Sequence, residues 1–177
     1  MEAVDVVKEE RLSDANRGPA FGRMVEVEAS LRGAVRTATV LIVGNETLTS
    51  PELQAAVSAR LRSGSTIFYI VVPATPIEHG LTWDEAETNR VAATRLVAML
   101  DRIHALGAKA AGEVGSKDPV AAVRDALREH AVDEIILSTL PSGISRWLGQ
   151  DVPTRLAKAV AVPVTVVTAE RLAVRSA

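Results

Sequence analysis

The residues best suited to chemistry in this chain lie in one polar segment, residues 138–150. Hydroxyl side chains are combined there with one flexible glycine and one cation, and these residues are Ser138, Thr139, Ser142, Gly143, Ser145 and Arg146. Hydroxyl groups, a guanidinium and the backbone N–H groups of a helix start are donors with which proteins hold a phosphate or a carboxylate. The segment therefore predicts an anion-binding site.

The same segment also has a purely structural explanation. Pro141, Ser142 and Gly143 are common turn residues, and Asp151 followed by Pro153 is a good helix start that needs no ligand. A carboxylate at Asp151 would moreover repel a phosphate. From the residues alone, the ligand site and the structural loop both remain open.

Composition excludes several classes of function. The chain has 177 residues, a formal net charge of −2 and a pI near 6.0, so it lacks the overall basic character of a nucleic-acid-binding protein. With two Trp, two Phe and one Tyr, it has too few aromatic side chains for a platform on which bases stack. Cysteine is absent, which excludes disulfides, thiolate catalysis and cysteine-ligated zinc.

Motifs of the common enzyme classes are missing. The sequence contains no G-x-S-x-G, no G-x-G-x-x-G and no G-x-x-x-x-G-K-[ST] motif. His79, His104 and His130 do not have the spacing of metal ligands. We therefore expect a protein that is not an enzyme and holds no metal, with a hydrolase or transferase of the nucleotide-binding α/β superfamily as a third-ranked alternative.

The ends of the chain differ from its middle. Residues 1–36 are charged and irregular and predict an N-terminal arm, residues 37–170 predict one α/β domain, and residues 171–177 predict a short tail. The N-terminal stretch has no apolar signal core, and no apolar run approaches the roughly 20 residues of a membrane span. We therefore expect a soluble, cytoplasmic protein with no membrane partner.

Apolar strands and amphipathic helices alternate along the middle of the chain. Strands are predicted at ATVLIVG, TIFYIVV, AKAAGEVG, Asp133–Ser138 and Pro163–Val167. Helix starts are predicted at Ser50-Pro51, at the capping box Thr82–Glu85, at Asp118-Pro119 and near Val152. This alternation predicts a parallel sheet with helices on both faces, joined by right-handed crossovers. The polar segment then follows the fourth strand, at the edge where such folds bind ligands.

The stretch from Thr37 to Thr168 resembles a universal stress protein domain. VLIVGNET is similar to the first strand and turn of that family, IFYIVVP to its second strand, GEVGSKDP to its third strand and the following helix cap, and DEIILST to its fourth. The strongest local matches are SGISR at 142–146 and VPVTVV at 162–167. The resemblance implies a three-layer α/β/α Rossmann-like sandwich with a five-stranded parallel sheet of order 3-2-1-4-5.

The positions that bind ATP in this family are altered here. ATP-binding members carry an Asp at the end of the first strand, where this chain has Asn45, and a G-x2-G-x9-G-[ST] loop after the fourth. The two leading glycines of that loop fall on Ser138 and Pro141, the spacer is one residue short, and the final pair falls on Gln150-Asp151. The chain thus resembles the members of the family that do not bind ATP.

These departures weaken a triphosphate site for physical reasons. If the Asp151 carboxylate faced a phosphate charge at about 4 Å, the repulsion would cost roughly 4 kcal/mol at an effective dielectric near 20. One charged hydrogen bond from Arg146 contributes only about 1 to 3 kcal/mol. Pro141 also removes a backbone N–H. Tight ATP binding in the usual pose is therefore disfavoured.

The resemblance leaves two predicted functions. The first is a stress-response or regulatory domain that is not a tight ATP binder and forms a homodimer through its last strand. The second is the binding of an adenine nucleotide or another small anion, with Val72 at the family's adenine-contacting position. The candidate ligand-binding residues are Asn45, Thr47, Val72, Ser138, Thr139, Ser142, Gly143, Ser145, Arg146, Gln150 and Asp151.

Overall fold

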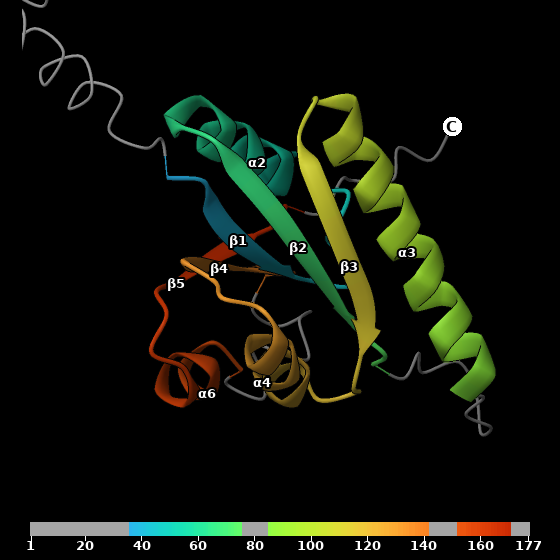
Figure 1. Cartoon of the computed structure of the whole chain (residues 1–177). Coiled ribbons are helices and arrows are strands. Elements are labelled where there is room, and N and C mark those ends of the chain that lie inside the picture. The colour runs from blue at the N-terminus through green and yellow to red at the C-terminus, as the bar shows by residue number, and fades with distance from the viewer. Residues whose placement is uncertain (1–35, 76–84, 142–151, 171–177) are drawn as a thin grey trace, which may run out of the picture. The chain divides into compact units, whose positions relative to one another are not determined.

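The fold is a three-layer α/β/α sandwich (Figure 1). The computed structural model describes residues 36–75, 85–141 and 152–170. Its sheet has five parallel strands in the order β3-β2-β1-β4-β5, which confirms the predicted order. The strands are β1 (Ala38–Val43), β2 (Thr66–Pro73), β3 (Lys109–Gly115), β4 (Glu134–Thr139) and β5 (Val164–Thr168). The predicted arm before residue 36 and the tail 171–177 lie outside the described residues.

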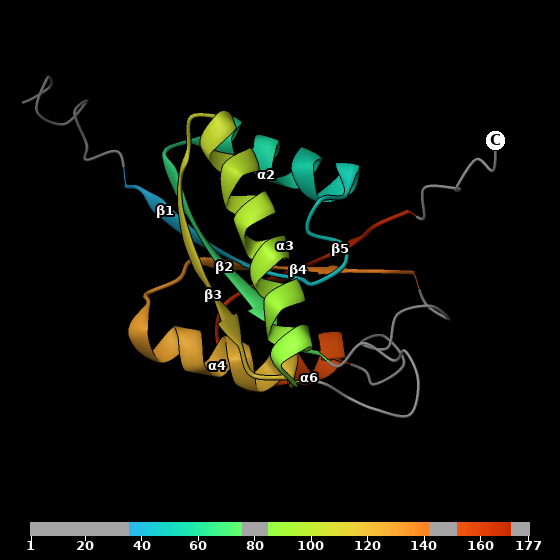
Figure 2. The ribbon, with the colours of Figure 1, turned by 90° about the vertical axis from the view of Figure 1, so that its right-hand side faces the viewer.

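Helices cover both faces of the sheet (Figure 2). The helices are α2 (Pro51–Ser63) and α3 (Glu85–Ala105) on one face, and α4 (Pro119–Glu129) and α6 (Val152–Ala159) on the other. Because side chains alternate along a strand, Val40 and Ile42 of β1 pack toward α2 and α3, whereas Leu41 and Val43 pack toward α4 and α6. The central strand is therefore buried on both sides.

Local sequence signals account for the helix boundaries. The Ser50 hydroxyl accepts the Leu53 N–H at 3.2 Å, and the Asp118 carboxylate accepts the Val120 N–H at 2.8 Å. Both predicted caps are thereby confirmed, each with proline at the start of its helix. Beyond the end of α3, Gly107 has a φ of 77°, a backbone conformation that favours glycine. Residues 82–84 of the predicted capping box lie outside the described residues.

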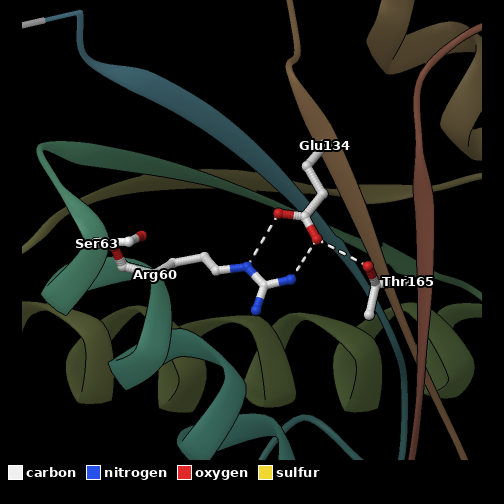
Figure 3. A network of polar contacts seen from close by, with 4 residues as sticks. All are labelled: Arg60, Ser63, Glu134 and Thr165. Atoms are coloured by element: carbon white, nitrogen blue, oxygen red, sulfur yellow. Dashed lines mark hydrogen bonds and ion pairs between the residues drawn. The ribbon is translucent and has the colours of Figure 1, made fainter.

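A polar network closes the amino-terminal end of the sheet (Figure 3). Arg60 of α2 donates from Nε to Glu134 Oε2 at 2.9 Å and forms an ion pair through Nη2 with Oε1. The Thr165 hydroxyl of β5 donates to Glu134 Oε1 at 2.8 Å. The hydrogen bond from Arg60 is the main cause that lowers the pKa of Glu134, while burial acts in the opposite direction. One carboxylate therefore ties α2, β4 and β5 together.

Candidate functional site

The carboxyl ends of β1 and β4 form the point where the strand order reverses. From β1, the chain continues into β2 on one side, and β4 pairs with β1 on the other. Open α/β sheets bind ligands beyond the strands at such a point. The fold places four predicted site residues at these ends, namely Asn45 and Thr47 after β1 and Ser138 and Thr139 on β4.

Gly44 lets the turn after β1 lie against the end of β4. A Cβ atom at this position would lie 2.9 Å from Leu48 Cδ2 and 3.3 Å from Ser138 Cβ. Since real Cβ atoms do not approach neighbouring carbon atoms within 3 Å, a side chain here would push against the Leu48 side chain and crowd Ser138. Gly44, which ends the predicted first strand, therefore allows the turn that carries Asn45 and Thr47 to lie close to Ser138 on β4.

Asn45 is held by two hydrogen bonds to different elements. Its side chain is largely buried, with 9% of the residue exposed. Nδ2 donates to the Pro73 carbonyl oxygen at the end of β2 at 2.9 Å, and Oδ1 accepts from Nη1 of Arg95 on α3. These two bonds fix the orientation of the amide, because only Nδ2 can donate and only Oδ1 can accept.

Arg95 is a site residue that sequence reasoning missed. It is half-buried, and among the described residues its single polar contact is the hydrogen bond to Asn45. The one available signal was its spacing from Arg102, seven residues later on the same helix face. Arg102 also reaches the turn after β1, where Nη1 donates to the Thr49 carbonyl oxygen at 3.4 Å.

Thr47 carries a buried hydroxyl without a partner. The residue is 4% exposed, and its Oγ1 has no hydrogen-bond partner in the described structure. Its carbonyl oxygen, by contrast, accepts the Ser50 N–H at 3.0 Å and the Ser138 hydroxyl at 3.4 Å. A buried hydroxyl without a partner is unfavourable for the fold, and because Oγ1 is itself buried, a ligand reaches it only when the groups around it move.

Of the remaining predicted site residues, three are buried and six lie outside the described ranges. Val72 is 0% exposed and packs in the core with α2 and α3, so a ligand can reach at most its main chain. Ser138 and Thr139 are also buried, and Thr139 Oγ1 donates to the Leu140 carbonyl oxygen at 3.4 Å. The predicted residues outside the described ranges are Ser142, Gly143, Ser145, Arg146, Gln150 and Asp151.

A cavity lies farther along the same end of the sheet. It measures about 430 Å³ and lies between the start of α3 and the ends of β2 and β3. Its lining includes Ala74, Thr88, Ser116 and Lys117, and none of the predicted site residues within the described ranges contributes to it. Within the described ranges, no group of three His, Asp or Glu side chains could hold a metal ion, and no helix could span a membrane.

Comparisons with known proteins identify the fold. No family model matches the chain, and neither does any curated protein. A solved universal stress protein from Archaeoglobus fulgidus is similar with a TM-score of 0.51 at 16% identity, covering 78% of this chain and 98% of that one. The chain has the universal stress protein fold.

Two further structures are less similar. One is the Archaeoglobus fulgidus universal stress protein in complex with dAMP, with a TM-score of 0.49, 18% identity and coverage of 75% of this chain and 98% of that one. The other is a universal stress protein family protein from Arabidopsis thaliana with AMP bound, with a TM-score of 0.49, 11% identity and coverage of 76% and 93%.

Proposed function

We propose that this protein is a non-catalytic regulatory domain of the universal stress protein type, acting in a stress response, and that it does not bind ATP tightly. The observation that carries the second part is the environment of Asn45. An aspartate at this position would offer two anionic oxygens, whereas Asn45 is neutral and its one acceptor oxygen already accepts from Arg95. Magnesium accompanies ATP and is held through carboxylates together with the phosphates. Asn45 cannot supply such a carboxylate, and the carboxylate next to it in sequence, that of Glu46, is exposed.

Calorimetry with ATP and magnesium tests this proposal. We expect no binding with a Kd below about 1 μM, which corresponds to roughly −8 kcal/mol. The Asp151→Ser variant should bind ATP more tightly than the wild type, because it removes a negative charge near the proposed phosphate position. Submicromolar binding of ATP by the wild type would contradict the proposal, as would hydrolysis of ATP above the buffer rate.

We also propose that the domain forms a homodimer through β5. This strand is at the edge of the sheet, and Val166 on it is 42% exposed. An apolar edge strand offers unpaired main-chain groups to a second copy. The Val166→Lys variant should therefore be a monomer in sedimentation at micromolar concentration. The matched control is Val97→Lys on α3, where the native side chain is 56% exposed and the dimer should persist. A monomeric wild type would exclude the dimer.

A second candidate function is the binding of an adenine nucleotide or another small anion at the β1 and β4 ends. The unpartnered Thr47 hydroxyl and the Arg95 guanidinium favour it, since both are donors at the predicted site. Calorimetry and thermal shift with ADP, AMP and cyclic AMP test it. No heat and no shift up to millimolar ligand would remove adenine nucleotides from consideration.

A further inference from the structure

At the end of β1, the carbonyl acceptors already have their hydrogen-bond partners, whereas several side-chain donors do not. The Pro73 carbonyl oxygen accepts from Asn45 Nδ2 at 2.9 Å and from the Thr75 N–H at 2.7 Å. The Thr47 carbonyl oxygen likewise accepts two hydrogen bonds, from the Ser50 N–H and the Ser138 hydroxyl. A carbonyl oxygen has two lone pairs, so both of these acceptors are saturated.

The donors in the same place are not saturated. A guanidinium carries five N–H groups, and Arg95 uses one of them on Asn45 within the described structure. Asn45 Nδ2 has a second hydrogen beyond the one given to Pro73. The Thr47 hydroxyl has no hydrogen-bond partner among the described residues. We call these three side chains, Asn45, Thr47 and Arg95, the β1 corner, and its spare groups are mostly donors.

The charge of the β1 corner is also unbalanced. Two arginines in the described ranges are half-buried, Arg60 and Arg95. Arg60 forms an ion pair with Glu134, whereas Arg95 contacts the neutral amide of Asn45. A partly desolvated cation gains most from an anionic partner, because charge-assisted hydrogen bonds are about twice as strong as neutral ones. The corner therefore has both the donors and the charge for an anion.

We infer that the β1 corner recognises an anionic oxygen of its ligand, on a phosphate or a carboxylate, and not the hydroxyl groups of a ribose. An aspartate would offer ribose hydroxyls two anionic acceptor oxygens, whereas Asn45 offers one neutral acceptor oxygen, which already accepts one hydrogen bond from Arg95, and also presents a donor. Arg95 is the specificity-determining residue, since it supplies the charge and fixes the Asn45 amide. This inference rests on the proposed binding of a nucleotide or small anion at this edge.

The test compares four ligands that differ in phosphate and ribose hydroxyls. AMP, 2′,3′-dideoxy-AMP, adenosine and inorganic phosphate are titrated by calorimetry into the full-length wild type and the Arg95→Gln and Arg102→Gln variants. Arg102 is the matched control, because it lies on the same helix face and contacts the same turn through Thr49. Thermal melting of each variant shows whether it is folded.

For the wild type, we expect AMP and dideoxy-AMP to bind within about threefold of each other and adenosine to bind at least tenfold more weakly. Arg95→Gln should weaken AMP about tenfold and leave adenosine unchanged, whereas Arg102→Gln should change neither. Arg95→Lys should recover part of the AMP affinity, since it restores the charge without the planar fork.

Two results would overturn the inference directly. One is a loss of tenfold or more from AMP to dideoxy-AMP, because it would show that the ribose hydroxyls are recognised. The other is an equal weakening of AMP and adenosine by Arg95→Gln, because that pattern indicates a structural role. If only inorganic phosphate binds, and Arg95→Gln abolishes this, the inference holds and the nucleotide function fails. If none of the four ligands binds, and acetate and citrate do not bind either, both the inference and the proposed nucleotide binding are wrong.

Discussion

The two half-buried arginines lie at opposite ends of the sheet and have opposite surroundings. At the amino-terminal end, Arg60 binds Glu134 through two nitrogens, and Thr165 satisfies the same carboxylate. At the carboxyl-terminal end, Arg95 contacts only the neutral Asn45 among the described residues. The two arginines thus differ in their hydrogen bonding: the network around Arg60 is complete, whereas the network around Arg95 is not. We interpret the completed network as stabilising the fold and the incomplete one as available to a ligand.

The largest expected effect is the difference in lost unfolding free energy between the Arg60→Gln and Arg95→Gln variants. Arg60→Gln leaves the Glu134 carboxylate partly buried without its cation, so we expect a loss of about 2 kcal/mol in the free energy of unfolding. Arg95→Gln should cost less than half of that, because it leaves no charge unpaired. Urea unfolding followed by circular dichroism measures both. Equal losses for the two variants would remove the distinction between the two ends.

The pH dependence of stability should follow Glu134. Its pKa in the folded protein is lowered from 4.5, mainly by the hydrogen bond from Arg60. Because the folded pKa is the lower one, the stabilisation is present above the unfolded value and is lost as the pH falls through the folded value.

Glu134→Gln lacks this titration and serves as the reference. The difference in unfolding free energy between wild type and variant should be constant near neutral pH and shrink below about pH 4.5. Other carboxylates with lowered pKa values, such as Asp118, are present in both proteins and cancel in the difference. A difference that stays constant to about pH 3 would show that the ion pair does not stabilise the fold.

Thr165→Val tests the amino-terminal network with a nearly isosteric change. The variant loses the hydrogen bond to Glu134 Oε1 and should lose about 1 kcal/mol of stability. Chemical unfolding at neutral pH measures the loss. In the Glu134→Gln background the cost of Thr165→Val should fall, because the hydroxyl then bonds to a neutral amide.

The same substitution at the other end, Thr47→Val, should have the smallest effect and the opposite sign. Its hydroxyl has no hydrogen-bond partner in the described part of the chain, so its removal should leave stability unchanged or raise it by up to about 0.5 kcal/mol. Binding of AMP should weaken in the same variant. A destabilisation as large as that of Thr165→Val would mean that the Thr47 hydroxyl is hydrogen-bonded in solution.

Strands and caps could be predicted because their signals are local. The apolar run ATVLIVG became β1, and Ser50-Pro51 and Asp118-Pro119 begin helices as their residue types indicated. Each of these signals spans a few neighbouring residues. The strand order came from the family resemblance, because an alternating pattern does not determine which strands pair.

The site was predicted only in part, because its geometry depends on contacts between distant residues. The contact between Asn45 and Arg95 joins residues 50 positions apart, and an arginine on a helix gives no sign of its partner. The burial of Thr47 depends on how closely the turn after Gly44 approaches β4. Val72 was expected at the family's adenine-contacting position; its side chain packs in the core cluster with residues of α2 and α3, and its contact with a ligand stays a prediction. The direction of the Asp151 carboxylate stays a prediction.

The strand order also has a consequence for the growing chain during synthesis. Ala38 of β1 pairs with Thr66, which follows soon in the sequence, whereas Val40 pairs with Glu134, which is made much later. Pairings distant in sequence form slowly, and the chain is synthesised from its N-terminus, so β1 and β2 exist before β4. One edge of the most buried strand therefore stays open until β4 has been made. An exposed apolar edge is prone to aggregation. We therefore expect the reversal of strand order at the candidate site to be also the step before which the unfinished chain exposes an apolar edge.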